Sequence, residues 1–128
     1  MFQKETIKES VAALPLKLED YCVITGTALV MHGIKEETKD IDISCTREAF
    51  RALAAKGYPI KQGAFARKVI YSDDTEIFED WHAGDIIMIE GVPVASLESV
   101  IMMKKQLDRE KDRVDIAKIE AHLAEQLN

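Results

Sequence analysis

Hydrophobic residues follow two different periods along the chain, and the alternation of these periods predicts alternating helices and strands. Apolar positions three or four residues apart are typical of helices, whereas short apolar runs bounded by turn residues are typical of strands. Helices are predicted within residues 3–19, where Pro15 ends or breaks the helix, and at 26–32, 46–55, 97–107 and 110–126. Strands are predicted at 21–24, 39–45, 67–71, 75–81 and 85–90. This order predicts an α/β (α+β) fold in which helices flank a small mixed β-sheet, with two helices at the C-terminus.

Residues at the ends of these segments give more local predictions. Thr46 and Ser96 each precede a helical pattern, and we expect both to cap the N-terminus of the helix that follows. Gly91 and Pro93 are predicted to interrupt the chain between the last strand and the first of the two C-terminal helices, because glycine and proline disfavour regular elements.

The composition is that of one globular domain spanning residues 1–128. Hydrophobic residues make up 47% of the chain and charged residues 31%, which excludes a disordered protein. No apolar run approaches the ~20 residues of a membrane span, and the start of the chain has no signal-peptide pattern. We therefore expect a cytoplasmic protein without a membrane partner. Cys22 and Cys45 lie in apolar strands without metal-ligand spacing, so we expect buried free thiols.

The net charge narrows the range of partners. At pH 7 the chain carries a formal charge of −6. This charge repels phosphates and argues against general, non-specific binding to RNA or DNA. It leaves room for a local basic groove.

The stretch 25–43 carries the most chemical information. A strand runs into the turn Gly26-Thr27, which opens a helix, and a second strand then carries Asp40 and Asp42. Alternate side chains of a strand share a face, so the two like charges repel unless a cation lies between them. Oxygen ligands suit Mg²⁺ or Mn²⁺, and backbone N–H groups at a helix N-terminus suit phosphate oxygens. The segment thus predicts a site for phosphate and a metal ion. The alternative is a pair of ordinary acids on a solvent-facing strand.

This pattern resembles the polymerase-beta-like nucleotidyltransferase superfamily, in which a Gly-Ser/Thr turn precedes an acid-apolar-acid strand. The C-terminal segment 97–116 looks like the closing helices of small stand-alone bacterial nucleotidyltransferases, including the toxins of abortive-infection systems. The resemblance implies a nucleotidyltransferase-like fold that binds an NTP with Mg²⁺ or Mn²⁺. It also implies transfer of a nucleoside monophosphate to a hydroxyl group of a protein, an RNA or a small molecule.

The resemblance assigns catalytic and metal-binding roles to three acids. Asp40 and Asp42 match the acidic pair, and a third carboxylate is expected from the strand around 75–80. Glu76 fits that position best, as a metal ligand or as the base that deprotonates the attacking hydroxyl. Asp80 is an alternative, and a charge at the edge of a turn, without a role in the site, is another.

The resemblance also implies nucleotide-binding residues. Gly26 and Thr27 would present N–H groups and a hydroxyl to the phosphates, and Lys104 matches a lysine that reaches them. Arg109 and Asp112 match further motif positions. On the residues alone, this charged segment is equally typical of a solvated salt-bridge helix, with Asp112 as a cap of the last helix.

Two positions depart from the family pattern. Thr25 stands where many relatives have the first glycine of the turn, and Glu36 stands where many have an arginine. A Cβ atom narrows the approach of phosphate to the backbone, and an acid repels it. These departures motivate a second hypothesis, a catalytically inactive nucleotide-binding, metal-binding or regulatory module of the same fold. A third is a structural or antitoxin-like interaction protein, which would form a dimer with the acidic pair buried at its interface.

Overall fold

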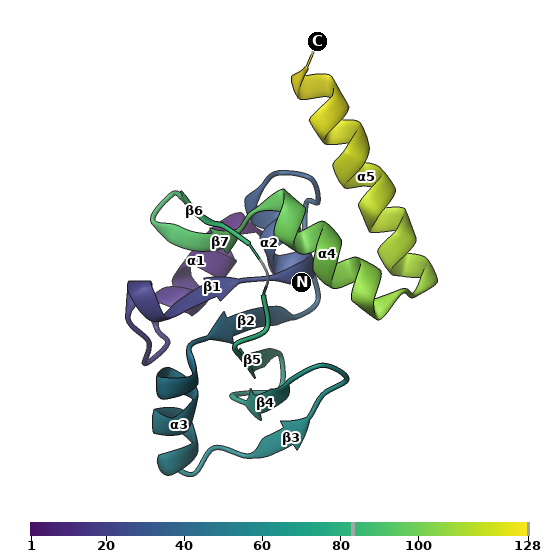
Figure 1. Cartoon of the computed structure of the whole chain (residues 1–128). Helices are drawn as coiled ribbons and strands as arrows, with labels where there is room; N and C mark the ends of the chain where they lie inside the picture. Colours follow the sequence, from purple (N-terminus) through teal and green to yellow (C-terminus); the bar gives the residue numbers. More distant parts are fainter. Residues whose placement is uncertain (83, 128) are drawn as a thin grey trace.

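The computed structural model describes residues 1–82 and 84–127, and within them one mixed β-sheet runs through the molecule (Figure 1). The sheet has the order β3-β4-β5-β2-β1-β7-β6. Its strands are β1 (Tyr21–Val23), β2 (Ile41–Cys45), β3 (Ile60–Gln62), β4 (Arg67–Ile70), β5 (Thr75–Glu79), β6 (Ile86–Ile89) and β7 (Val92–Ala95). The helices are α1 (Lys4–Ala12), the 3-10 turn η1 (Leu18–Asp20), α2 (Thr25–Met31), α3 (Arg47–Ala55), α4 (Leu97–Leu107) and α5 (Glu110–Gln126).

The predicted fold class is confirmed: helices flank a mixed sheet, and α4 and α5 close the chain. The predicted caps are confirmed too, because Thr46 accepts a hydrogen bond from the Ala49 N–H and Ser96 accepts one from the Ser99 N–H. Both cysteines are buried and free. Among the helices of the described residues, none has the length and apolar character that crossing a membrane requires.

Two strands were not predicted. β7 contains Pro93, so the expected interruption at this residue is wrong: β7 pairs with β6 on one side and with β1 on the other. β3 consists of three exposed residues without apolar alternation, and it is a strand because it pairs with β4. In both segments, pairing with neighbouring strands decides a conformation that the local sequence disfavours or leaves open.

Strand β2 occupies the middle of the sheet. It pairs antiparallel with β1 and parallel with β5, and the parallel register places Asp42 opposite Glu76. Ile41 and Ile43 are buried on one face of β2, and Asp42 alternates with them. The strand therefore contributes to the core and to a polar face at the same time.

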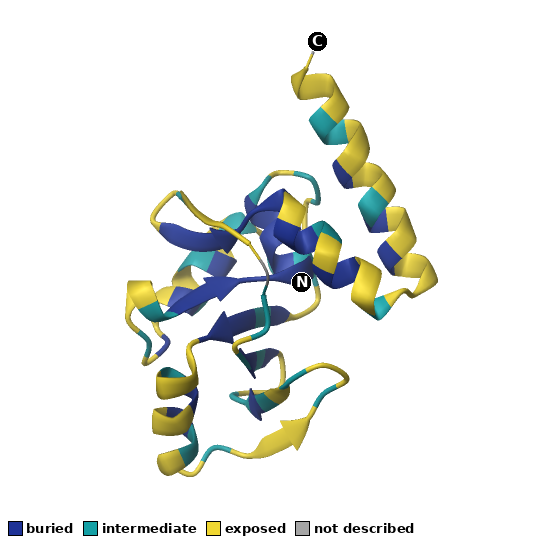
Figure 2. Cartoon of the chain, in the orientation of Figure 1, coloured by how far each residue is buried: buried dark blue, intermediate teal, exposed yellow. Residues whose placement is uncertain are grey.

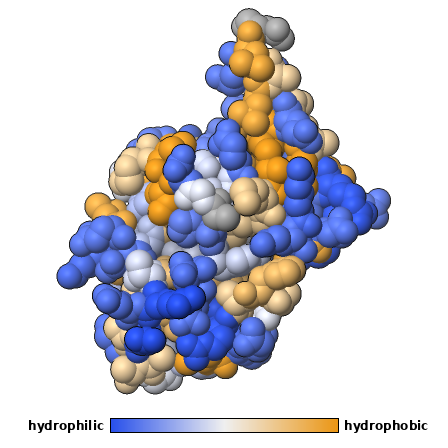
Figure 3. All heavy atoms as spheres, viewed as in Figure 1, coloured by the Kyte–Doolittle hydropathy of each residue, from blue (hydrophilic) through white to orange (hydrophobic). Residues whose placement is uncertain are grey.

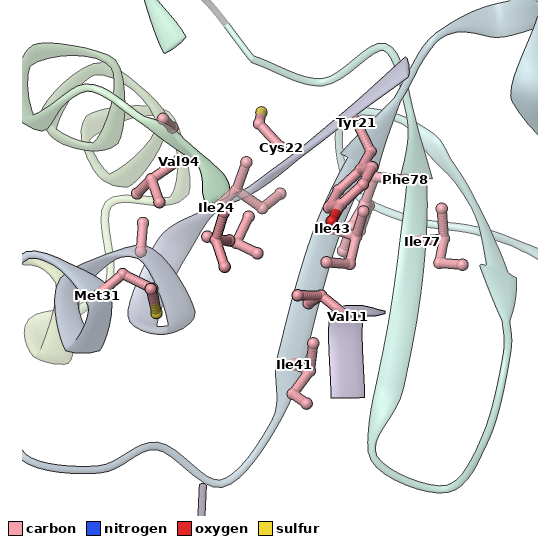
Figure 4. Packing of buried hydrophobic residues seen from close by; sticks show 14 of the residues in the cluster. Val11, Tyr21, Cys22, Ile24, Met31, Ile41, Ile43, Ile77, Phe78 and Val94 are labelled. Carbon is pink, nitrogen blue, oxygen red and sulfur yellow. The ribbon is translucent and has the colours of Figure 1, made fainter. Parts of the chain in front are cut away.

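Helices bury the apolar residues of the sheet. α3 contacts β4 and β5, and α2 contacts β2, β7 and α4. Figure 4 shows part of the resulting core, with Ile43 of β2, Ile77 of β5 and Val94 of β7 in one cluster. Buried residues concentrate in the central strands and in α2, whereas most of α5 is exposed (Figure 2).

Helix α5 contacts α4 and extends away from the sheet (Figure 1). Hydrophobic residues run along α5 on the face drawn in Figure 3. Of its apolar positions, Ile119 is fully buried and Val114 is exposed, as is Leu127 directly after the helix. The start of α5, next to the end of α4, is the part that reaches the polar face described below.

Replacing Ile43 by alanine tests the central position of β2. Ile43 has no exposed surface, so Ile43→Ala is expected to lower the free energy of unfolding by about 2–5 kcal/mol, measured by urea denaturation. Ile87→Ala is the matched control, because this side chain on the edge strand β6 is 42% exposed and its loss should change stability by only about 0.5 kcal/mol. Equal effects of the two substitutions would contradict the placement of β2.

Candidate functional site

A cleft of about 390 Å³ lies over the polar face of β2 and its neighbours. It brings together residues that are far apart in the sequence: the start of α2, the acids of β2 and β5, the 63–66 loop and the junction of α4 and α5. Most of the residues predicted from the sequence line this cleft: Gly26, Asp40, Asp42, Glu76, Lys104 and Arg109. Thr27, Asp80 and Asp112 do not line it.

Two acids lie opposite each other in the parallel strands, and a third is close to them in the sequence. Asp42 and Glu76 are register partners, and Asp40 is exposed immediately before β2. Burial raises the pKa of the Asp42 carboxyl above its usual range, and a hydrogen bond from Thr25 opposes this shift. The negative charges of Glu76 and Asp40 raise the same pKa further. A cation in this part of the cleft would relieve that repulsion.

The fit of these acids to a metal ion depends on Lys68. Its ammonium lies 2.9 Å from Oε2 of Glu76 and already neutralises that carboxylate. Among the described residues, no group of three His, Cys, Asp or Glu side chains lies close enough together to hold a metal ion. Asp40 and Asp42 offer the hard oxygen ligands that Mg²⁺ and Mn²⁺ prefer, whereas Glu76 would be available to a metal ion only without its ion pair to Lys68. The metal site stays a prediction.

The turn at the start of α2 brings the backbone close to the cleft. A Cβ atom on Gly26 would lie 3.1 Å from Oγ1 of Thr38, so glycine permits the close packing of these two segments. Thr27 is fully buried; its hydroxyl donates to the carbonyl of Asp40 and accepts from the N–H of Asp42, at 3.0 and 2.9 Å. Its role in this structure is to tie α2 to the acid-bearing strand.

Thr25 has a role that the sequence did not indicate. Its φ angle is 51°, a left-handed conformation that is rare for a β-branched residue and costs of order 1–3 kcal/mol. In this conformation its hydroxyl donates a 2.6 Å hydrogen bond to Oδ2 of Asp42. The sequence showed only a missing glycine, whereas the structure shows a side chain that orients the central carboxylate.

Lys104 belongs to a buried network of ion pairs. It is 4% exposed, and its ammonium lies 2.9 Å from Oδ2 of Asp115 and 3.3 Å from Oδ1 of Asp112. Asp112 is fully buried and also binds the guanidinium and the backbone N–H of Arg109. The expectation that Asp112 caps the last helix is confirmed, since the second of these bonds closes the N-terminus of α5. Lys104 itself is not a solvated surface lysine.

The same network gives the cleft its charge. Asp115 pairs with Lys35 at 3.0 Å as well as with Lys104, and Lys35 lines the cleft whereas Glu36 does not. Six lysine or arginine side chains and four acids line the cleft, in a chain whose net charge is −6. The cleft is therefore a local basic groove that suits an anionic ligand.

No family model matches the chain, and no curated protein matches it either. The chemistry of the cleft is therefore the basis for a functional proposal. Its polar face offers paired carboxylates, a glycine turn and an excess of cationic side chains.

Replacing Asp112 tests the buried network of ion pairs through the pH dependence of protein stability. Burial raises the pKa of the Asp112 carboxyl, but the hydrogen bonds from Arg109 and the charge of Lys104 outweigh burial and lower it from 3.8 to about 2. A carboxyl with a lowered pKa stabilises the fold above its ordinary pKa, and this contribution is lost as the pH falls towards 2. Asp112→Asn should lower the free energy of unfolding at pH 7 by roughly 3–5 kcal/mol, because it leaves Lys104 undercompensated.

The measurement is urea denaturation at pH 7 and at lower pH down to the limit of the folded state. The wild type should lose stability steeply below about pH 4, and Asp112→Asn should show a shallower loss. Asp73→Asn, in an exposed turn, is the control and should follow the wild type. A pH dependence that is unchanged in Asp112→Asn would contradict the assigned role of this carboxylate.

Proposed function

We propose that this chain is a minimal nucleotidyltransferase of the polymerase-beta-like type. It binds a nucleoside triphosphate with Mg²⁺ or Mn²⁺ in the cleft and transfers the nucleoside monophosphate to a hydroxyl group of an acceptor. One observation carries the proposal: six residues that the resemblance singled out line one cleft, although they come from the start of α2, the segment around β2, β5 and the junction of α4 and α5. They are Gly26, Asp40, Asp42, Glu76, Lys104 and Arg109.

In this proposal the acids and the glycine turn have different roles. Asp40 and Asp42 hold the divalent ion, which when bound supplies positive charge against the phosphates. Thr25 fixes the orientation of Asp42 through its hydroxyl. Gly26 lets the backbone approach the phosphate oxygens. Glu76, beside Asp42, is the third metal ligand or the base that takes the proton of the acceptor hydroxyl.

Cationic side chains complete the site. The ammonium of Lys104 has three donors, and Asp112 and Asp115 engage two of them, which leaves one for a phosphate oxygen. The acceptor hydroxyl attacks the α-phosphorus, the bond to the bridging oxygen breaks, and pyrophosphate leaves. Basic residues along the cleft balance the charge of that leaving group.

The ion pair between Lys68 and Glu76 favours a second candidate function. With Glu76 neutralised and Thr25 in place of glycine, the fold would bind a nucleotide or a metal without turning it over. Such a module would regulate a protein partner or a second copy of itself. The two functions differ in whether a covalent product forms.

Calorimetry tests the nucleotide site. Each NTP is titrated with Mg²⁺ into the wild type and into the double variant Asp40→Ala/Asp42→Ala. We expect binding by the wild type and at least a roughly tenfold loss in the double variant, because two of the proposed metal ligands are gone. Asp73→Ala, outside the cleft, is the control and should bind like the wild type. An absence of binding by the folded wild type, or equal binding by the double variant, would exclude the proposed site.

An assay for transfer of a nucleoside monophosphate distinguishes the two candidate functions. The protein is incubated with α-labelled NTPs, Mg²⁺ and one acceptor class at a time: total RNA, protein extract or small hydroxyl compounds. A labelled product that requires Asp42, and disappears in Asp42→Asn, supports the transferase. Nucleotide binding without a labelled product in any class would instead favour the inactive module.

A further inference from the structure

Aromatic side chains form one wall of the cleft, and the function proposed above does not use them. Phe65, Phe78 and Trp81 all line it. The rings of Phe65 and Trp81 are nearly parallel, with an interplanar angle of 15° and centroids 6.2 Å apart. The ring centroids of Phe78 and Trp81 are 5.0 Å apart. Phe65 remains 51% exposed although it is large and apolar. An exposed ring on a platform of stacked rings can receive a further planar group.

The register of the sheet places this platform next to the acids. Ser44 lies two residues beyond Asp42 on the same face of β2, about 6.6 Å along the strand. Its hydroxyl accepts a 2.9 Å hydrogen bond from the N–H of Trp81, and its partner on β5 is Phe78. The acids and the aromatic side chains thus occupy successive rows of one face. A nucleotide whose phosphates lay at the first row and whose base lay at the second would span the two rows with its ribose.

The platform is held in place before any ligand binds. The indole N–H of Trp81 donates to Oε1 of Gln106 at 3.1 Å, which fixes the ring against α4. In the 63–66 loop, the N–H of Gly63 donates to the carbonyl of Ala66, and a Cβ atom on Gly63 would lie 2.7 Å from that oxygen. The loop is tight only because residue 63 is glycine, and its small neighbours leave the ring of Phe65 uncovered.

We propose that Phe65 and Trp81 form a nucleobase subsite that stacks the base of the donor nucleotide. The inference rests on the proposed nucleotidyltransferase function and extends it by assigning the base end of the substrate. Stacking tolerates every base, because each has a π-face. The subsite therefore strengthens the binding of all four nucleotides, and a free polyphosphate does not use it.

Trp81 is the only tryptophan of the chain, so its fluorescence reports directly on this subsite. ATP, GTP, CTP, UTP and inorganic tripolyphosphate are each titrated with Mg²⁺ into the wild type, Phe65→Ala and Phe65→Tyr, by fluorescence and by calorimetry. Nucleotides should quench Trp81 and tripolyphosphate should not. Phe65→Ala should weaken nucleotide binding roughly 5- to 100-fold and leave tripolyphosphate binding unchanged. Phe65→Tyr keeps the ring and should restore nucleotide affinity.

The outcomes separate the two proposals. Tripolyphosphate binding together with equal nucleotide affinity in the wild type and Phe65→Ala would overturn the subsite and leave the phosphate site standing. Failure of every ligand to bind the folded wild type would overturn both. Binding of a short oligoribonucleotide is measured as well. If Phe65→Ala weakens the binding of the oligoribonucleotide but not that of NTPs, the aromatic platform holds a base of the acceptor. The assignment to the donor nucleotide would then be wrong.

Discussion

The pairing of β2 with β1 and β5 is the constraint on which the rest of the structure depends. Because side chains alternate, the strand buries Ile41 and Ile43 in the core and turns Asp42 to the opposite face. The parallel register then sets Glu76 beside Asp42. A slip of one residue in this pairing would bury a carboxylate in the core and empty the polar face, so the hydrophobic core itself fixes the geometry of the acids.

The cost of gathering like charges on this face is offset by a positive charge and a hydrogen bond nearby. Lys68 neutralises Glu76, and the hydroxyl of Thr25 opposes the rise in the pKa of Asp42 that burial causes. Thr25 reaches Asp42 from a left-handed backbone conformation, which costs free energy that the surrounding packing must supply. Backbone strain and neighbouring like charges in the same place are typical of binding sites and catalytic sites.

Contacts outside the acid cluster hold two further parts of the cleft in place. Buried ion pairs of Lys104 with Asp112 and Asp115 hold the start of α5 against the end of α4. On the aromatic wall, Trp81 is held by the side chains of Ser44 and Gln106. Elements that are distant in the sequence therefore meet around one cleft, and their side chains are held by hydrogen bonds and ion pairs.

The sequence by itself determined the fold class, the positions of most helices and strands, and the candidate acids. Those features depend on local periodicity and on residue types that stand a few positions apart. Only the tertiary structure decided that β7 forms despite Pro93, that Lys68 pairs with Glu76, and that Phe65 lies near Trp81 in the cleft. The physical reason is that strand pairing and ion pairing join residues through space, and the pattern of one segment does not record which distant segment it will meet.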